Sequence, residues 1–354
     1  MSTHHDIAVD IRDLQVTFTG GRQPVRAVNG VDLQVRRGEV LALLGESGSG
    51  KSVTLRSLLR LHPPKQTQMS GQIWVGGEDV MAMSPGQLAD HRGRVTSMIF
   101  QEPLLALDPV YAIGAQIVES IRRHEPTVTA QQAQQRALEL FERVRIPSPE
   151  RRLAAYPHEM SGGMRQRAMI ALALACRPQV LLADEPTTAL DATVQIQILL
   201  LLRELQRDLG LTVIFVTHDI GAAIEVADRI AVMYAGRLVE EGLTRELIRS
   251  PQHPYTRARW PAGPTARWPG APAWPPSQAA HPICQPCPQG ARSPLVARWP
   301  PRTACTATPR RYVAARPTSC AACTRRTPLP QRRVLAYLKW AWRACSPSPV
   351  LART

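Results

Sequence analysis

The chain has 354 residues, 44% of them hydrophobic, and a formal net charge of +15. All of that net charge comes from residues 258–354, which contain fifteen Lys and Arg residues and no Asp or Glu, so residues 1–257 are formally neutral. No run of about 18 apolar residues occurs, and residues 1–6 lack a charged-then-apolar secretory pattern. We therefore expect a cytosolic protein that meets any membrane through other chains.

The chain begins with strand-like segments, at residues 7–18, 31–35, 39–44 and 72–75. A glycine-rich loop, Gly-Glu-Ser-Gly-Ser-Gly-Lys-Ser, follows the third segment at residues 45–52 and precedes an amphipathic helical pattern. Glycines let successive backbone N–H groups converge on phosphate oxygens, and the following helix offers its N-terminus to the same anion. We expect Lys51 to reach the outer phosphates and the Ser52 hydroxyl to bind magnesium. This context favours a phosphate loop over a simple Gly/Ser-rich turn.

Two helical patterns, at residues 112–123 and 130–144, lie between this loop and a second glycine pair. That pair, in Ser161-Gly162-Gly163, precedes a further helical pattern over residues 164–175. A glycine pair at a helix N-terminus can bind an anion, although alone it most often forms a turn. Because the chain already has a phosphate loop, we expect this segment to serve the nucleotide of a partner subunit.

An apolar run over residues 180–183 predicts a buried parallel strand that ends in Asp184 and Glu185. Ligands of open α/β sheets bind at the carboxyl ends of strands, so Asp184 can hold magnesium, mostly through water. Glu185 is placed to polarise an attacking water as a general base. Strand and helix patterns alternate up to residue 240, which predicts a parallel sheet.

The order of these motifs resembles the nucleotide-binding subunit of an ABC transporter. Residues 45–52, 156–167, 183–191 and 250–257 more narrowly resemble the ATPases of the oligopeptide/dipeptide and nickel importers. The last of these segments, Ser-Pro-Gln-His-Pro-Tyr-Thr-Arg, matches the end of that subfamily's nucleotide domain. The resemblance extends from about residue 7 to residue 257.

The resemblance implies an α/β fold, the P-loop NTPase type of ABC cassette. It would have a mostly parallel core sheet, an antiparallel side sheet and a helical subdomain. We expect the ATPase domain to occupy residues 1–257 and its helical subdomain about residues 102–160. The helical subdomain would dock on a membrane partner.

The resemblance also implies roles for individual residues. Phe18 would stack on adenine, unless it is an ordinary strand aromatic. Gln101 and His218 would contact the γ-phosphate, and Gln101 would join the core to the helical subdomain. Asp191 would cross to the partner subunit, or it could cap the helix that begins at residue 192.

Together these considerations give three expected sets of site residues. The catalytic set is Glu185, His218, Gln101 and Lys51. The nucleotide-binding set is Phe18, Gly45, Glu46, Ser47, Gly48, Ser49, Gly50, Lys51, Ser52, Gln101, Ser161, Gly162, Gly163 and Asp191. The magnesium-binding set is Ser52, Gln101 and Asp184.

The resemblance implies an ATPase that uses ATP and Mg²⁺ to drive import of peptides or related small solutes. It would work at the cytoplasmic face of the inner membrane, bound to integral membrane permease subunits. Its other partners would be a second ABC ATPase subunit, identical or more typically a paralogue, and indirectly an extracytoplasmic solute-binding protein. No nucleic-acid partner is expected.

Two other classes remain open at this point. The first is a soluble ABC-type ATPase that acts on nucleic acid or the ribosome, with the basic end as a nucleic-acid arm. Such proteins usually carry two cassettes or long insertions, whereas this chain has one compact cassette. The second is a metal-binding module around Cys284, Cys287, Cys320 and Cys323, which form two Cys-x-x-Cys pairs. These pairs lie in a Pro- and Arg-rich stretch without apolar periodicity.

Residues 258–354 depart abruptly from the family pattern. They contain six of the seven cysteines and six of the seven tryptophans, and Ala-Arg-Trp-Pro recurs at 258–261, 266–269 and 297–300. A GC-rich gene translated in the wrong frame yields such a composition. We therefore expect a frameshifted or otherwise misread end, with a genuine disordered basic tail as the alternative.

Resequencing the gene across codons 250–265 tests this expectation directly. We expect an inserted or deleted base that, once corrected, restores a Leu/Ala-rich helix after residue 257. An unbroken frame, together with tail peptides detected by mass spectrometry in the native source, would refute it.

Overall fold

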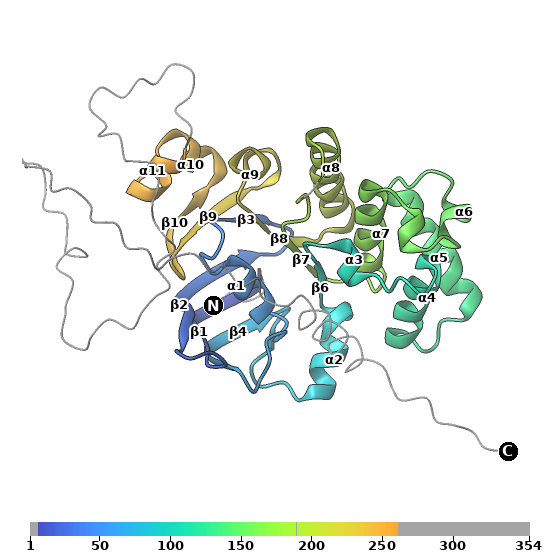
Figure 1. Cartoon of the computed structure of the whole chain (residues 1–354), viewed down its shortest axis with the longest axis horizontal. Coiled ribbons are helices and arrows are strands. Elements are labelled where there is room, and N and C mark those ends of the chain that lie inside the picture. The colour runs from blue at the N-terminus through green and yellow to red at the C-terminus, as the bar shows by residue number, and fades with distance from the viewer. Residues whose placement is uncertain (1–5, 189, 261–354) are drawn as a thin grey trace, which may run out of the picture.

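The computed structural model describes residues 6–188 and 190–260, without the side chain of Leu105. Two sheets and a group of helices make up this part of the chain (Figure 1). Residues 261–354 lie outside the described residues, and so do the expectations for the basic end, including its two Cys-x-x-Cys pairs.

The first sheet is antiparallel and has the strand order β2-β1-β4-β5. Its strands are β1 (Ile7–Phe18), β2 (Val25–Arg36), β4 (Thr67–Val75) and β5 (Glu78–Asp79). The strands β2 and β4 begin earlier than the sequence pattern predicts, because residues 25–29 and 67–70 pair with β1 as well. The expected antiparallel side sheet is confirmed.

The second sheet has the order β10-β9-β3-β8-β7-β6 and is parallel except at its β10 edge. Its strands are β3 (Val40–Leu44), β6 (Thr96–Ile99), β7 (Val180–Asp184), β8 (Thr212–Thr217), β9 (Arg229–Tyr234) and β10 (Arg237–Leu243). Every residue of β3, β7 and β8 is buried. Such apolar runs, buried on both faces, are typical of central parallel strands, and the expected parallel core sheet is confirmed.

Alternate residues of the central strands belong to two hydrophobic clusters. In β3, for example, Val40, Ala42 and Leu44 pack with the helices, whereas Leu41 and Leu43 pack toward the antiparallel sheet. The two-residue period of a strand sends successive side chains to opposite faces, so one strand contributes to both clusters. The parallel sheet thus lies between the antiparallel sheet and a helical layer.

The helices are α1 (Lys51–Ser57), α2 (Pro85–Arg94), α3 (Pro103–Ala106), α4 (Ile113–His124), α5 (Ala130–Arg143), α6 (Pro149–Leu153), α7 (Gly162–Leu174), α8 (Ala192–Leu209), α9 (Ile220–Val226), α10 (Thr244–Arg249) and α11 (Pro254–Arg259), with a 3₁₀ turn at Pro157–Glu159. Figure 1 shows α4, α5 and α6 as a lobe at one end of the molecule, far from α10 and α11. These helices lie within the expected helical subdomain. No helix in the described ranges is long and apolar enough to cross a membrane.

Amphipathic pairing holds the helical lobe together. Ile113, Ile117 and Ile121 of α4 recur every four residues and are fully buried, and they share a cluster with Phe141 of α5. A capping box at Thr129 fixes where α5 begins, because its side chain accepts from Gln132 N and Gln132 bonds back to Thr129 N.

We expect Phe141→Ala to destabilise the protein by about 3–5 kcal/mol, because the ring is fully buried and its loss leaves a cavity. Denaturant unfolding followed by circular dichroism measures the change. Gln134→Ala on the exposed side of α5 is the control and should change stability by less than about 0.5 kcal/mol. Equal effects of the two substitutions would contradict the assigned packing.

Candidate nucleotide-binding site

A cavity of about 540 Å³ lies beside the phosphate loop that joins β3 to α1. It is lined by Ala27, Glu46, Ser47, Gly48, Gly50, Lys51, Ser52, Val53, Gln101, Glu185, His218 and Arg259. Gln101, Glu185 and His218 follow the carboxyl ends of β6, β7 and β8. The cavity therefore occupies the edge of a parallel sheet where open α/β proteins bind their ligands.

The phosphate loop depends on glycine where its backbone is tightest. At Gly50, φ is +103°, and an added Cβ would lie 2.5 Å from the Ala27 carbonyl oxygen. At Gly45 an added Cβ would lie 2.4 Å from the Met233 carbonyl oxygen. These glycines are the residues that the sequence pattern singles out, and side chains there would force the loop away from its neighbours.

Lys51 lies almost completely buried, with 4% of its surface exposed, and its ammonium group faces the loop itself. Its Nζ donates to the carbonyl oxygens of Gly45 at 2.9 Å and Glu46 at 2.7 Å. Burial lowers the pKa of Lys51, and the nearby Glu185 carboxylate opposes that effect. The buried Ser49 hydroxyl has no hydrogen-bond partner among the described residues. A curled loop with a buried cation and a spare hydroxyl fits a phosphate group.

Asp184 is fully buried at the end of β7, and its carboxylate connects the strand to α1. The Ser52 hydroxyl donates to Asp184 Oδ1 at 2.6 Å, and Arg56 Nη2 donates to Oδ2 at 3.0 Å. Hydroxyl and carboxylate oxygens are the ligands that Mg²⁺ prefers. Within the described residues no three His, Cys, Asp or Glu side chains form a metal cluster. A magnesium ion beside Ser52 and Asp184 would take further ligands from water and phosphate, and the predicted role of Gln101 as a third protein ligand remains a prediction.

Two predicted residues, Gln101 and His218, and one further residue, Thr188, converge on Glu185. Its Oε2 accepts from Gln101 Nε2 at 3.3 Å and from Thr188 Oγ1 at 2.9 Å. Its Oε1 lies 3.4 Å from His218 Nδ1. The Glu185 backbone has φ +47°, a conformation that is uncommon outside glycine and costs of order 1 kcal/mol or more. The fold thus holds this carboxylate in a strained position against the cavity.

Seven of the predicted nucleotide-binding residues do not line the cavity. Gly45 and Ser49 belong to the phosphate loop itself, and the other five are Phe18, Ser161, Gly162, Gly163 and Asp191. The Phe18 ring packs edge-on against His62, with ring centroids 5.6 Å apart. Ser161 caps α7 by accepting from Met164 N, and Asp191 caps α8 by accepting from Val194 N at 3.0 Å. The capping alternative for Asp191 is therefore observed, and the other roles of these residues remain predictions.

The structure adds three residues that the motifs did not identify. Arg56 lies four residues after Ser52, so the two side chains lie on the same face of α1. This spacing could have revealed that Arg56, like Ser52, contacts Asp184. Thr188 lies three residues after Glu185 in the same turn. Arg259 lies 213 positions after Glu46 and beyond the expected end of the domain at residue 257, so no local signal could have placed it in the cavity.

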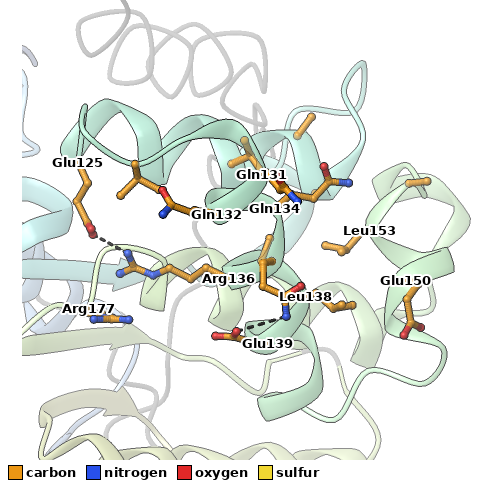
Figure 2. Close-up of a pocket in the computed structure, with 17 residues that line it drawn as sticks. Glu125, Gln131, Gln132, Gln134, Arg136, Leu138, Glu139, Glu150, Leu153 and Arg177 are labelled. Atoms are coloured by element: carbon orange, nitrogen blue, oxygen red, sulfur yellow. Dashed lines mark hydrogen bonds and ion pairs between the residues drawn. The ribbon is translucent and has the colours of Figure 1, made fainter.

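A second, larger cavity of about 1090 Å³ lies among α4, α5 and α6 (Figure 2). Arg136 Nη1 pairs there with Glu125 at 2.7 Å, and Gln135 donates to Glu139. None of the predicted site residues lines it. Volume therefore does not locate the chemistry in this molecule, and the smaller cavity at the phosphate loop is the candidate site.

Comparison with known proteins agrees with this geometry. The family model of the ABC transporter matches residues 28–188. The chain is 50% identical to a probable peptide ABC transporter ATP-binding protein of Sinorhizobium fredii, over 72% of this chain and 76% of that protein. It is 46% identical to the oligopeptide transport ATP-binding protein OppD of Bacillus subtilis, over 70% of this chain and 69% of that protein.

One solved structure that resembles the chain is the ATP-binding cassette MJ0796, a dimer in a post-hydrolysis state with ADP and Pi bound. It has a TM-score of 0.60 and 28% identity, and the match covers 67% of this chain and 99% of that one. The matching fold, the phosphate loop and the close relatives lead to one conclusion. The chain belongs to the ABC transporter family, among the ATP-binding proteins of the oligopeptide and dipeptide type.

Proposed function

We propose that the chain is the ATP-hydrolysing subunit of an importer for peptides or related small solutes. The observation that carries the proposal is the convergence of Gln101, His218 and Glu185 beside the phosphate loop. The relatives described above have peptide-transport names, and neither is described as acting on nucleic acid. We therefore prefer the transporter function to a nucleic-acid ATPase.

In the proposed reaction, Glu185 orients and deprotonates the water that attacks the terminal phosphate of ATP. Gln101 and Thr188 donate to one oxygen of the carboxylate, and His218 lies at the other, so the group is held from both sides. Lys51 and Ser52 would hold the phosphates and magnesium with Asp184. The bound magnesium ion would neutralise charge on the phosphate oxygens.

We further propose that two ATPase subunits, identical or paralogous, form a head-to-tail sandwich. Ser161, Gly162 and Gly163 lie at the N-terminus of α7 but outside their own chain's cavity. A helix N-terminus favours an anion, so this segment would contact the nucleotide held by the other subunit. The dimeric state of the related cassette MJ0796 supports such pairing.

Membrane permease subunits would dock next to Gln101. Three apolar side chains that follow it are exposed, namely Leu104 (53%), Val110 (72%) and Tyr111 (54%). In sequence they lie between Gln101 and α4, so nucleotide-dependent movement of Gln101 would reach both the helical lobe and a docked permease. We propose that residues 1–257 act in this way at the cytoplasmic face of the membrane, with an extracytoplasmic solute-binding protein that delivers the solute.

We expect Glu185→Gln to keep ATP binding and to lower the rate of ATP hydrolysis by about 10²-fold or more, because the amide cannot accept the proton. Steady-state phosphate release measures turnover, and calorimetry measures binding. Lys51→Ala is the contrasting variant and should weaken nucleotide binding itself, because it removes a positive charge from the phosphates. Near-normal hydrolysis by the glutamine variant would exclude Glu185 as the base.

We expect Ser161→Arg to abolish ATP-driven dimerisation and to leave ATP binding by the monomer almost unchanged. Analytical ultracentrifugation measures assembly, with the paralogous ATPase added if the chain does not pair with itself. Ser84→Arg is the matched control, because Ser84 also caps a helix but lies at α2, outside the proposed interface. Equal loss of nucleotide binding in the Ser161 variant monomer would show that the segment serves its own cavity.

A further inference from the structure

The segment 250–257, which ends the family pattern, has no role in the mechanism above, yet it attaches the last described helix to the core. The Glu240 carboxylate of β10 accepts from Gln252 N at 2.6 Å and His253 N at 3.0 Å. His253 Nδ1 then accepts from Tyr255 N at 3.2 Å and caps α11. These bonds fix the position at which α11 begins.

Tyr255 fixes the direction of the same helix. Its ring packs against Tyr234 at the end of β9, with centroids 4.6 Å apart and planes inclined by 42°. One turn later, the Arg259 guanidinium carbon lies 5.9 Å from the centre of the Tyr255 ring. A cation over an aromatic face is an attractive arrangement, so Tyr255 supports Arg259 as well as the helix.

The supported guanidinium reaches the wall of the nucleotide cavity. Arg259 Nη2 donates to the His218 carbonyl oxygen at 3.0 Å, and Nη1 lies 3.5 Å from Glu46 Oε1. The Arg259 side chain is only 24% exposed. It therefore connects the phosphate loop, through Glu46, to the loop that carries His218.

Among the charged groups that line the cavity, the Arg259 guanidinium is suited to bind a phosphate group. Lys51 is the other cation of the lining, whereas Glu46 and Glu185 supply two carboxylates. Burial is the main reason that the pKa of Lys51 is lowered, and the positive charge of Arg259 contributes in the same direction. A guanidinium has five N–H donors in a planar fork that matches phosphate oxygens, and the two contacts above use only part of them.

We propose that Arg259 is a further phosphate-binding residue of this ATPase, which contacts the terminal phosphate of ATP from the His218 side of the cavity. The proposal rests on the ATP binding proposed above and on the alternative that Arg259 is a genuine residue of the chain and not part of a misread end. The terminal phosphate is the favoured target because Arg259 contacts His218 and Glu46, and His218 in turn lies beside Glu185. On nucleotide binding, the guanidinium would exchange its long contact with Glu46 for the phosphate and keep the His218 carbonyl.

The test compares Arg259→Gln with Arg257→Gln in the full chain, whose sequence across residues 250–262 is first verified by mass spectrometry. Arg257 is the matched control because it lies on the same helix and carries the same charge, but it does not line the cavity. Its Nε instead donates to the Pro251 carbonyl oxygen. Calorimetry gives Kd for ADP and for the non-hydrolysable ATP analogue AMP-PNP, and circular dichroism verifies the fold of each variant.

We expect Arg259→Gln to bind AMP-PNP about tenfold more weakly than the wild-type chain, since a charge-assisted bond to phosphate is lost. Its ADP affinity should change by less than about threefold, and Arg257→Gln should match the wild-type chain with both nucleotides. Arg259→Lys keeps the charge and should recover part of the lost affinity.

Three results would overturn the proposal. Unchanged AMP-PNP affinity in Arg259→Gln would remove any role in phosphate binding, and tighter affinity would show that the guanidinium closes the cavity. Equal losses for ADP and AMP-PNP would exclude the terminal phosphate as its target. If the wild-type chain itself binds neither nucleotide, the proposed ATPase function fails first, so the two failures are distinguishable.

Discussion

The site depends on the parallel register of three central strands. Leu44 of β3 pairs with Thr217 of β8, and Asp184 of β7 pairs with Val216 of β8. Parallel strands carry their carboxyl ends at the same edge of the sheet, so residues that are far apart in sequence meet there. Ser52 and Asp184, for example, are 132 positions apart and share a hydrogen bond. Burial of every residue in these strands makes a shift in register costly, since a slip of one residue would exchange the two hydrophobic clusters. The geometry of the cavity is therefore fixed by the hydrophobic core.

That edge also concentrates strain and charge. Asp184 is buried but hydrogen-bonded to Ser52 and Arg56, so its charge is compensated before any ion or nucleotide binds. The next residue, Glu185, has a positive φ and turns its side chain toward Gln101 and His218. Two adjacent carboxylates thus have different surroundings, because Asp184 is bonded to α1 in the core and Glu185 contacts Gln101 and His218 beside the cavity. This difference is what allows the first to serve a metal and the second a proton, in the mechanism that we propose.

The local parts of this arrangement could be predicted from sequence, and the distant parts could not. Glycine spacing identified the phosphate loop because the conformation of Gly50 excludes other residues, and apolar runs identified β3, β7 and β8. The first residues of β2 and β4 have no continuous apolar run, and their pairing with β1 is what makes them strands. Arg259 could not be placed in the cavity either, since its position depends on Glu240 and Tyr234, on other elements. Phe18 was expected from the family pattern, but its ring lies against His62, outside the lining of the cavity.

The starts of α7 and α8 are the physical basis for the proposed pairing of two subunits. Ser161 and Asp191 each satisfy one backbone N–H at the start of α7 and α8, and an added Cβ at Gly163 would lie 2.9 Å from Val194. The starts of α7 and α8 are therefore packed together and form one surface. The first N–H groups of α7 have no partner within their own helix, so this surface favours an anion. Their own chain's phosphate loop lies in a cavity that neither segment lines. The separation of these two surfaces on one chain is the physical basis of the two-subunit sandwich that we propose.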